Sequence, residues 1–192
     1  MAAASLCIGL TGRMASGKGE AVRILGGHGF TYVSLSDIVR QEAARQRRAV
    51  SRDRMQDIGN RLRAEGGAGV LGRRVRERIA ASDPACWVID GIRNPAEVLE
   101  LKKMGAFFLV AIECDIAVIL ARMKRRGRTG DAVSEEELRA ALDREWGKDE
   151  PEDGQQVGRT MALADFIVSN NGTLAELKGR LEAVLTKLGV EA

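Results

Sequence analysis

The sequence predicts an α/β protein with three layers, α/β/α, in which helices cover both faces of a five-stranded parallel sheet. The first observation behind this prediction is that apolar runs of strand length alternate with helical segments along the 192 residues. The second is that most of these runs are apolar throughout, which is typical of parallel strands buried on both faces. We expect the strands at residues 6–11, 30–34, 86–90, 107–113 and 165–169.

The expected helices begin after polar residues that can cap them. Lys18 starts the first helix, directly after the loop that follows the first strand. Ser36 is expected to cap a helix over residues 38–47. Thr173 is expected to cap the last helix, whose apolar face starts at Leu174. The remaining helices are expected to start at Ser51 and to cover the segments 70–81, 95–105, 116–123, 134–146 and 155–163.

The loop between the first strand and the first helix is rich in glycine and reads Gly12-Arg13-Met14-Ala15-Ser16-Gly17-Lys18-Gly19. Two glycines five residues apart, with a lysine after the second, match the phosphate-binding P-loop pattern. Glycine allows successive backbone N–H groups to turn inward as an anion nest, and the positive end of the following helix points at the same place. The alternative is a turn that binds nothing, but the flanking strand and helix favour phosphate binding, with Lys18 near the β- and γ-phosphates.

The residue after Lys18 departs from the common P-loop pattern. Gly19 stands where Ser or Thr usually ligates Mg²⁺, so we expect any metal to be held through phosphates, waters and a carboxylate elsewhere. Asp90 ends an apolar strand and is expected to supply that carboxylate, acting through water. The alternative for Asp90 is a residue that only terminates its strand.

Two further segments place a carboxylate and an arginine after a predicted strand, at the same edge of the sheet as the P-loop. Arg40 and Arg93 are suited to bind a phosphate of an acceptor molecule through bidentate hydrogen bonds. The alternative for Asp37 is a partner in helix capping. The two segments are Ser36-Asp37-Ile38-Val39-Arg40 and Asp90-Gly91-Ile92-Arg93-Asn94.

The composition is that of a globular protein, with 45% hydrophobic and 30% charged residues and a net charge of +3. The small net charge and the scarcity of aromatic residues disfavour nucleic acid as a partner. The three cysteines lie far apart without metal-ligand spacing, so we expect reduced thiols in a cytoplasmic protein. No apolar run reaches membrane-spanning length, so we expect no membrane partner.

These motifs resemble those of P-loop kinases of the adenylate-kinase-related and dephospho-CoA-kinase-like type. Gly-Lys-Gly at 17–19 is similar to the adenylate kinase version of the P-loop. Ser-Asp-x-x-Arg at 36–40 and Asp-Gly-x-Arg at 90–93 are similar to the acceptor segments of that family. Residues 121–128 resemble the arginine-rich start of the lid in nucleoside monophosphate kinases, and residues 164–173 resemble the end of dephospho-CoA kinases.

The resemblance implies a P-loop NTPase fold like that of nucleoside monophosphate kinases, with ATP and Mg²⁺ as cofactors. One departure is that Glu20 stands where the adenylate kinases usually have threonine. After the last strand, Asn170 and Gly172 would flank the adenine, as the corresponding loop does in dephospho-CoA kinases. The residues expected to bind the ATP phosphates are Gly12, Arg13, Ala15, Ser16, Gly17, Lys18, Gly19 and Glu20.

The resemblance also implies catalytic roles for four residues. Lys18 holds the phosphates, and Arg122 and Arg126 of the lid close on the phosphoryl group that is transferred. Asp37 matches the carboxylate that, in dephospho-CoA kinases, takes the proton from the acceptor hydroxyl. If the acceptor group is instead a phosphate, no strong base is needed, and Asp37 positions Mg²⁺ or a ribose.

The long polar segments are expected to be two inserts above the carboxyl ends of the strands. The first, 36–82, is expected to bind the acceptor, and the second, 124–153, to form the lid. The rest of the single domain, 1–35, 83–123 and 154–192, is its core. We therefore expect an enzyme that moves the γ-phosphate of Mg-ATP to a nucleotide or a phosphorylated small metabolite.

The sequence is also compatible with a second function, that of a nucleotide-binding regulatory or nucleic-acid-associated NTPase without a small-molecule acceptor. Such a protein would use the arginines at 40–63 on the phosphate backbone of a nucleic acid. Against this function, Asp90 is followed by glycine, where many motor ATPases have the glutamate that polarises water.

Overall fold

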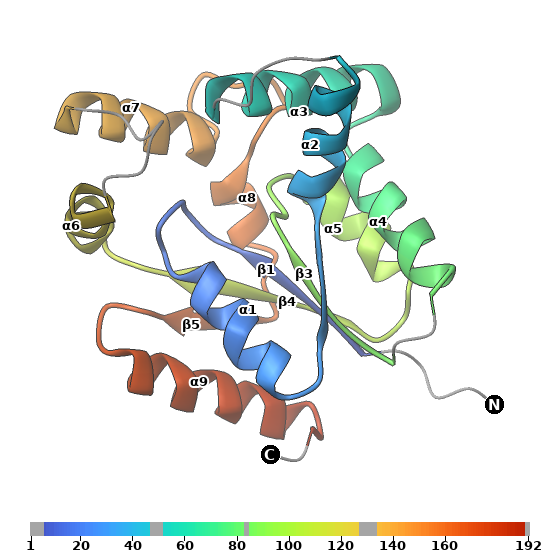
Figure 1. Cartoon of the computed structure of the whole chain (residues 1–192), viewed down its shortest axis with the longest axis vertical. Helices are drawn as coiled ribbons and strands as arrows, with labels where there is room; N and C mark the ends of the chain where they lie inside the picture. The colour runs from blue at the N-terminus through green and yellow to red at the C-terminus, as the bar shows by residue number, and fades with distance from the viewer. Residues whose placement is uncertain (1–5, 47–51, 83–84, 127–133, 191–192) are drawn as a thin grey trace.

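The computed structural model describes residues 6–46, 52–82, 85–126 and 134–190, and it contains the predicted five-stranded parallel sheet (Figure 1). The strand order is β2-β3-β1-β4-β5, and every neighbouring pair is parallel. The central strand is therefore the one that leads into the Gly-rich loop. The strands are β1 (Leu6–Thr11), β2 (Thr31–Ser34), β3 (Cys86–Asp90), β4 (Phe107–Glu113) and β5 (Phe166–Ser169).

Helices cover both faces of the sheet, which confirms the predicted fold class (Figure 1). One face packs against α1 and α9, which bury Leu25 and Leu181 among the side chains of β1, β3 and β4. The other face packs against α2, α4 and α5. The helices are α1 (Lys18–Gly27), α2 (Leu35–Arg45), α3 (Arg52–Gly66), α4 (Val70–Ala80), α5 (Pro95–Lys102), α6 (Ile116–Arg126), α7 (Glu135–Trp146), α8 (Val157–Met161) and α9 (Leu174–Lys187).

A third, smaller apolar cluster joins α6 and α7 to the loop after β1. Its buried members include Met123 of α6 and Leu142 of α7, and Met14 and Ala15 of the loop pack against it. Burying this apolar surface holds the two helices at the carboxyl end of the central strand. The segment that the sequence predicts as a lid therefore packs on the P-loop, through its helix α7.

Two details of the helix predictions are wrong. Helix α2 begins at Leu35, and its cap is Ser34 instead of Ser36, because the Ser34 hydroxyl accepts a hydrogen bond from the backbone N–H of Ser36 at 3.1 Å. Leu35 is buried in the core, which requires the helix to start one turn earlier than polarity alone suggests. Leu174 is 58% exposed, so it does not belong to the buried face of α9.

The predicted cap at the start of α9 is confirmed. Ser134 and Thr173 each form a capping box with the glutamate three residues later. Cys7, Cys86 and Cys114 are free thiols. Among the described residues, no helix is both long enough and apolar enough to cross a membrane.

Candidate functional site

The loop at residues 12–19 leaves the central strand and enters α1 in a conformation that depends on glycine. Gly12 and Gly17 have φ angles of 138° and 108°, in the region that side chains disfavour. A Cβ atom at Gly12 would lie 2.4 Å from the carbonyl oxygen of Ile112, and one at Gly17 would lie 2.0 Å from Asn170 Nδ2. The two glycines of the motif are therefore required by backbone conformation and by close packing.

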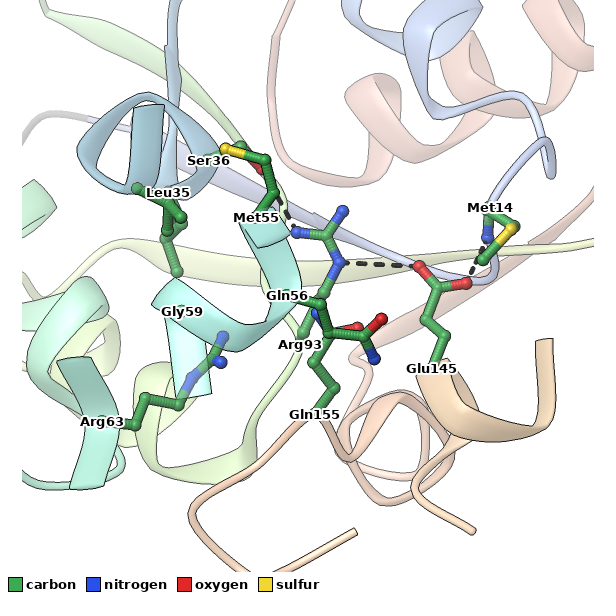
Figure 2. Close-up of a pocket in the computed structure, with 11 residues that line it drawn as sticks. Met14, Leu35, Ser36, Met55, Gln56, Gly59, Arg63, Arg93, Glu145 and Gln155 are labelled. Carbon is green, nitrogen blue, oxygen red and sulfur yellow. Dashed lines mark hydrogen bonds and ion pairs between the residues drawn. The ribbon is translucent and has the colours of Figure 1, made fainter. Parts of the chain in front are cut away.

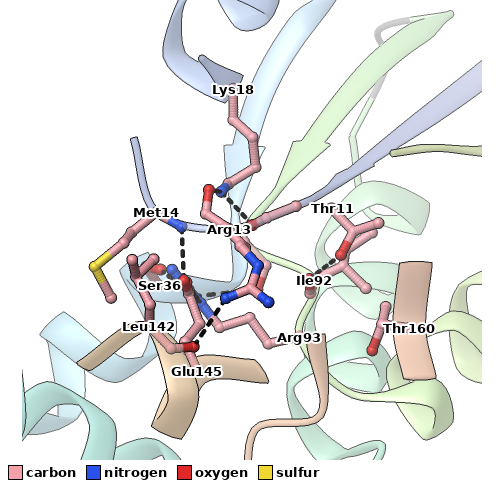
Figure 3. Close-up of polar contacts among 12 residues, drawn as sticks. Thr11, Arg13, Met14, Lys18, Ser36, Ile92, Arg93, Leu142, Glu145 and Thr160 are labelled. Carbon is pink, nitrogen blue, oxygen red and sulfur yellow. Dashed lines mark hydrogen bonds and ion pairs between the residues drawn. The ribbon is translucent and has the colours of Figure 1, made fainter. Parts of the chain in front are cut away.

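The ammonium group of Lys18 lies inside this loop (Figure 3). Its Nζ donates hydrogen bonds to the carbonyl oxygens of Gly12 at 2.6 Å and Arg13 at 2.8 Å. Burial lowers the pKa of Lys18, and the negative charges of Glu145 and Asp90 partly oppose this shift. A bound phosphate could replace the two carbonyl groups as the hydrogen-bond acceptor of this cation.

Asn170 and Arg122 support the loop from behind, on the side of α6 and the end of β5. Asn170 Nδ2 donates to the carbonyl oxygen of Ser16 at 2.7 Å. Arg122 donates to the carbonyl oxygens of Asn170 at 2.9 Å and Ser16 at 3.4 Å. Among the described residues, the buried hydroxyl of Ser16 has no hydrogen-bond partner, which fits a loop built to receive oxygen atoms of a ligand.

The remaining predicted residues near the loop lie at its edges. Gly19 faces open space, and Glu20 pairs with Arg23 on the exposed side of α1 at 2.6 Å. Arg13 stacks on the ring of Trp146 of α7, with 4.0 Å between the guanidinium carbon and the ring centroid. The last predicted residues lie on the other side of the loop, where Gly172 lines a groove next to α6 and Arg126 ends α6, its side chain outside the described residues.

On the other side of the P-loop, a cavity of about 160 Å³ lies between the loop, α2, α3 and α7 (Figure 2). The P-loop supplies Met14 to its wall, and Arg93 enters from the loop after β3. The structure thus places a phosphate-binding loop and a polar cavity side by side, with one residue shared between them. The cavity is lined by Met14, Leu35, Ser36, Val39, Met55, Gln56, Gly59, Arg63, Arg93, Glu145 and Gln155.

The four predicted residues of the acceptor side occupy different places. Arg93 donates from Nη1 to the hydroxyl of Ser36 at 3.2 Å and lies in the cavity. Asp37 and Arg40 pair with each other on α2 and do not line the cavity. Asp90 accepts a hydrogen bond from the backbone N–H of Gly91 at 2.7 Å. The structure therefore brings Arg93, but not the pair on α2, to the wall of the cavity.

Glu145 is the main residue of this region that sequence reasoning missed. Its Oε2 accepts a hydrogen bond from the backbone N–H of Met14 at 2.6 Å, and its Oε1 lies 3.5 Å from Nε of Arg93 (Figures 2 and 3). The side chain is 4% exposed. A signal existed, because Glu145 follows Leu138 and Leu142 at helical spacing and so falls on the buried face of α7.

Arg63 was also missed, and it is held by a buried ion pair. Its Nε and Nη2 lie 2.9 and 2.8 Å from Oε1 of Glu97, and the two side chains are 2% and 0% exposed. The second oxygen of Glu97 accepts hydrogen bonds from the backbone N–H groups of Arg93 and Asn94. The pair joins α3 to the start of α5, and it fixes the backbone that carries Arg93.

Arginines of the predicted basic segment pair with acidic neighbours. Arg40 pairs with Asp37 and Arg61 with Glu65 on the same helix, in addition to the buried pair of Arg63. Paired arginines present less free charge to the phosphate backbone of a nucleic acid. These contacts do not favour the alternative function.

Within the described residues, no group of three or more His, Cys, Asp or Glu side chains could hold a metal ion. A magnesium ion at the P-loop would therefore need oxygen ligands from the nucleotide and from water. The negative charge of Asp90 raises the pKa of Lys18, so Asp90 lies near the P-loop. A magnesium ion bound with the nucleotide would lie in the same region.

Comparison with known proteins identifies the family. The profile of the AAA domain family matches residues 11–139. A UPF0200 protein of Sulfurisphaera tokodaii is 31% identical over 94% of this chain and 96% of its own length. A UPF0200 protein of Methanoculleus marisnigri is 33% identical over 95% of this chain and 96% of its own length.

Solved structures show the same fold at low sequence identity. TT1252 from Thermus thermophilus has a TM-score of 0.62 and 18% identity, over 97% of this chain and 99% of its own. Dephospho-CoA kinase from Campylobacter jejuni has a TM-score of 0.52 and 15% identity, over 97% of this chain and 98% of its own. A gluconokinase from Sinorhizobium meliloti has a TM-score of 0.55 and 16% identity, over 96% of this chain and 94% of its own. The chain therefore belongs to the UPF0200 protein family, and it carries an AAA domain with the P-loop fold that small-molecule kinases share.

Proposed function

We propose that this protein is an ATP-dependent phosphotransferase, which moves the γ-phosphate of Mg-ATP to a small-molecule acceptor. The observation that carries this proposal is the position of Met14. It belongs to the P-loop and also lines the neighbouring cavity, so a phosphate in the loop and a molecule in the cavity would lie on either side of one residue. The fold of the solved dephospho-CoA kinase and gluconokinase structures supports the same class of reaction.

On the nucleotide side, the ammonium group of Lys18 and the backbone N–H groups of residues 12–19, apart from that of Met14, would hold the phosphates. The base would enter a groove of about 560 Å³ that is lined by α6 and by the residues after β5, including Arg122 and Gly172. Asn170 would act through the loop, because its side chain holds the carbonyl group of Ser16. Arg122 would also act through the loop, because it donates hydrogen bonds to the carbonyl oxygens of Asn170 and Ser16. We assign Arg126 to the phosphoryl group that is transferred.

On the acceptor side, Arg93 would bind the acceptor inside the cavity. Asp37 and Arg40 of α2 would contact the part of the acceptor that lies outside the cavity. Asp90 would orient the hydrated magnesium ion. When it is bound, Mg²⁺ neutralises charge on the β- and γ-phosphates. Phosphoryl transfer otherwise depends on placing the reactants in line and on compensating the developing charge, which the arginines and the P-loop provide.

Helix α7 would keep water away from this reaction, because it contacts both sides of the site. Its Arg13–Trp146 and Met14–Glu145 contacts join it to the P-loop. Arg144 of α7 joins it to α3 through Asp57 at 2.9 Å. A lid that spans both binding regions excludes water as a competing acceptor when it is closed.

The proposal is tested by measuring ADP release from Mg-ATP with a panel of nucleoside monophosphates, dephospho-CoA and small metabolites. At least one acceptor should accelerate ADP release, and Lys18→Ala should reduce that rate by about 10²- to 10³-fold, as the loss of one electrostatic donor does in other enzymes. Lys178→Ala on α9 is the matched control, because Lys178 is exposed and pairs with Glu182 of the same helix at 3.6 Å. Equal rates with and without every acceptor would contradict the proposal.

A further inference from the structure

The charges that line the cavity balance each other. Arg63 is paired with Glu97, and Arg93 is paired with Glu145. The other polar side chains of the cavity wall are the uncharged Ser36, Gln56 and Gln155. A phosphate monoester carries a charge of about −1.5 to −2 at neutral pH, and burying it requires cations that are not already neutralised. Among the described residues, the wall of this cavity does not supply such an excess.

Glu145 occupies the boundary between the two binding regions. One of its oxygens accepts a hydrogen bond from the backbone N–H of Met14, in the P-loop, and the other faces Arg93, in the cavity. A carboxylate at this point can accept a hydrogen bond from a hydroxyl group, and it would place that hydroxyl next to the terminal phosphate of the nucleotide.

The volume of the cavity also indicates the size of the group that it can enclose, and one side of the cavity opens to solvent. Its volume is about 160 Å³. An engineered protein cavity of about 150 Å³ is known to hold one benzene molecule. The cavity is therefore large enough for one six-membered ring, and it is too small to enclose a nucleobase, a ribose and a phosphate together.

The wall offers hydrogen bonds to such a ring. The Nε2 atom of Gln56 is buried and has no hydrogen-bond partner among the described residues. Gln56 as a whole is 9% exposed and lines the cavity. A buried amide N–H group without a partner is costly, so its presence indicates an acceptor oxygen of a ligand. Ser36 and Gln155 add polar groups to the same wall.

From these observations we infer that the acceptor is a small polar alcohol of about one six-membered ring, with Glu145 as the group that takes the proton from its hydroxyl. This inference rests on the proposed kinase function. The hydroxyl oxygen forms a bond to the γ-phosphorus of ATP, and the bond from that phosphorus to the bridging oxygen breaks. ADP leaves with the electron pair of the broken bond, and the hydroxyl proton moves to an oxygen of Glu145. Asp37, which Arg40 holds on α2, then serves as a positioning group.

The first test uses the wild-type protein with Mg-ATP and two sets of acceptors. One set contains cyclic polyols, hexoses and hydroxy acids with a ring, and the other contains nucleoside monophosphates. Phosphorus NMR of the products distinguishes a phosphate monoester from a phosphoanhydride. The inference predicts a monoester on a member of the first set. A phosphoanhydride on a nucleoside monophosphate would overturn the inference and leave the proposed kinase function intact.

The second test replaces the proposed proton acceptor. Glu145→Gln should lower kcat for the alcohol by about 10²- to 10⁴-fold, the range for general base catalysis, with a change in KM of only a few-fold. Asp143→Asn is the matched control. Asp143 lies on the same helix, and its exposed carboxylate accepts a hydrogen bond from Lys148 Nζ at 3.3 Å. Formate should partly restore the activity of Glu145→Ala, which a purely structural role would not explain. An undiminished kcat in Glu145→Gln would overturn the assignment.

Failure of the proposed function and failure of the inferred acceptor class give different results. If the wild-type protein does not bind Mg-ATP by calorimetry, the proposed function fails. If it binds Mg-ATP but phosphorylates no alcohol of the first set, the inferred acceptor class fails. The product analysis needs no variant, so the inference stays testable even if Glu145→Gln does not fold.

Discussion

The two halves of the site are built in different ways. The nucleotide half consists mainly of backbone groups within one continuous segment, residues 12–19, whose shape depends on Gly12 and Gly17. The acceptor half consists of side chains from α2, α3, α7 and the loop after β3, held together by the ion pairs of Arg63 and Arg93. The first half is a local structure, whereas the second exists only when distant segments have packed.

This difference predicts how each half responds to mutation. A backbone nest is sensitive to a change of conformation at one residue and tolerant of charge changes elsewhere. A cavity built on buried ion pairs is sensitive to the loss of either partner, because a buried charge without its partner is strongly destabilising. Substitutions in each half separate these two responses.

The largest effect on stability is expected in the acceptor half, at the buried pair of Arg63 and Glu97. Arg63→Met leaves the Glu97 carboxylate without its cation, at a cost of about 3–5 kcal/mol in the free energy of unfolding. Denaturant titration followed by circular dichroism measures this change.

Arg61→Met on the same helix is the control for that experiment. Arg61 lies 3.8 Å from Glu65, and both side chains are exposed. The expected change is below about 1 kcal/mol, as for other surface ion pairs. Equal losses of stability in the two variants would show that the buried pair does not hold the acceptor half together.

The next effect is expected in the nucleotide half, at Gly17. Gly17→Ala forces a side chain onto a backbone with φ of 108° and places a Cβ atom 2.0 Å from Asn170 Nδ2. We expect a loss of about 1–3 kcal/mol in the free energy of unfolding, together with weaker binding of Mg-ATP. Gly26→Ala on α1 is the control, because a Cβ atom there meets no atom within 4 Å. If both variants behaved alike, the close packing at Gly17 would not matter.

The pH dependence of nucleotide binding sharpens the description of the same half. Burial lowers the pKa of Lys18, and only the charged ammonium group attracts the phosphates. Affinity for Mg-ATP should therefore be constant while Lys18 is charged and fall by about tenfold per pH unit above its lowered pKa. Calorimetry above pH 8, with circular dichroism to verify folding, should show this fall beginning below the ordinary lysine value of about 10.4. An affinity that stays constant up to that value would contradict the prediction.

The smallest effect is expected where the two halves meet, at the contact of Arg13 with Trp146. A cation–π contact of this kind contributes about 0.5–1 kcal/mol at a partly exposed site. A double-mutant cycle with Arg13→Met and Trp146→Leu measures the coupling in the free energy of unfolding. A coupling of zero would mean that the two side chains lie together without attracting each other.

The fold and the P-loop could be predicted because their signals are local. Apolar runs such as those at 86–90 and 107–113 specify buried parallel strands by themselves, and the structure places strands there. The capping boxes at Ser134 and Thr173 are also local, because each involves only four consecutive residues. The cap of α2 was misplaced because Leu35 is drawn into the core, which is a tertiary effect.

The cavity could not be predicted in the same way. Arg63 and Glu97 are 34 residues apart in the sequence, and no local pattern indicates that they pair. Glu145 lies 131 residues from Met14 in the sequence, although it accepts a hydrogen bond from the backbone N–H of this P-loop residue. Its place on the apolar face of α7 marks it as buried, but only the packed structure shows what it contacts.

The most direct test of the account is a calorimetric titration of the wild-type protein and of Lys18→Ala with Mg-ATP. The account predicts one binding site per chain and an affinity that falls by about 10- to 100-fold in the variant, the value of a charged hydrogen bond. Lys178→Ala should bind Mg-ATP as the wild type does. Unchanged affinity in Lys18→Ala, or no binding by the wild type, would contradict the claim that the segment between β1 and α1 holds the triphosphate.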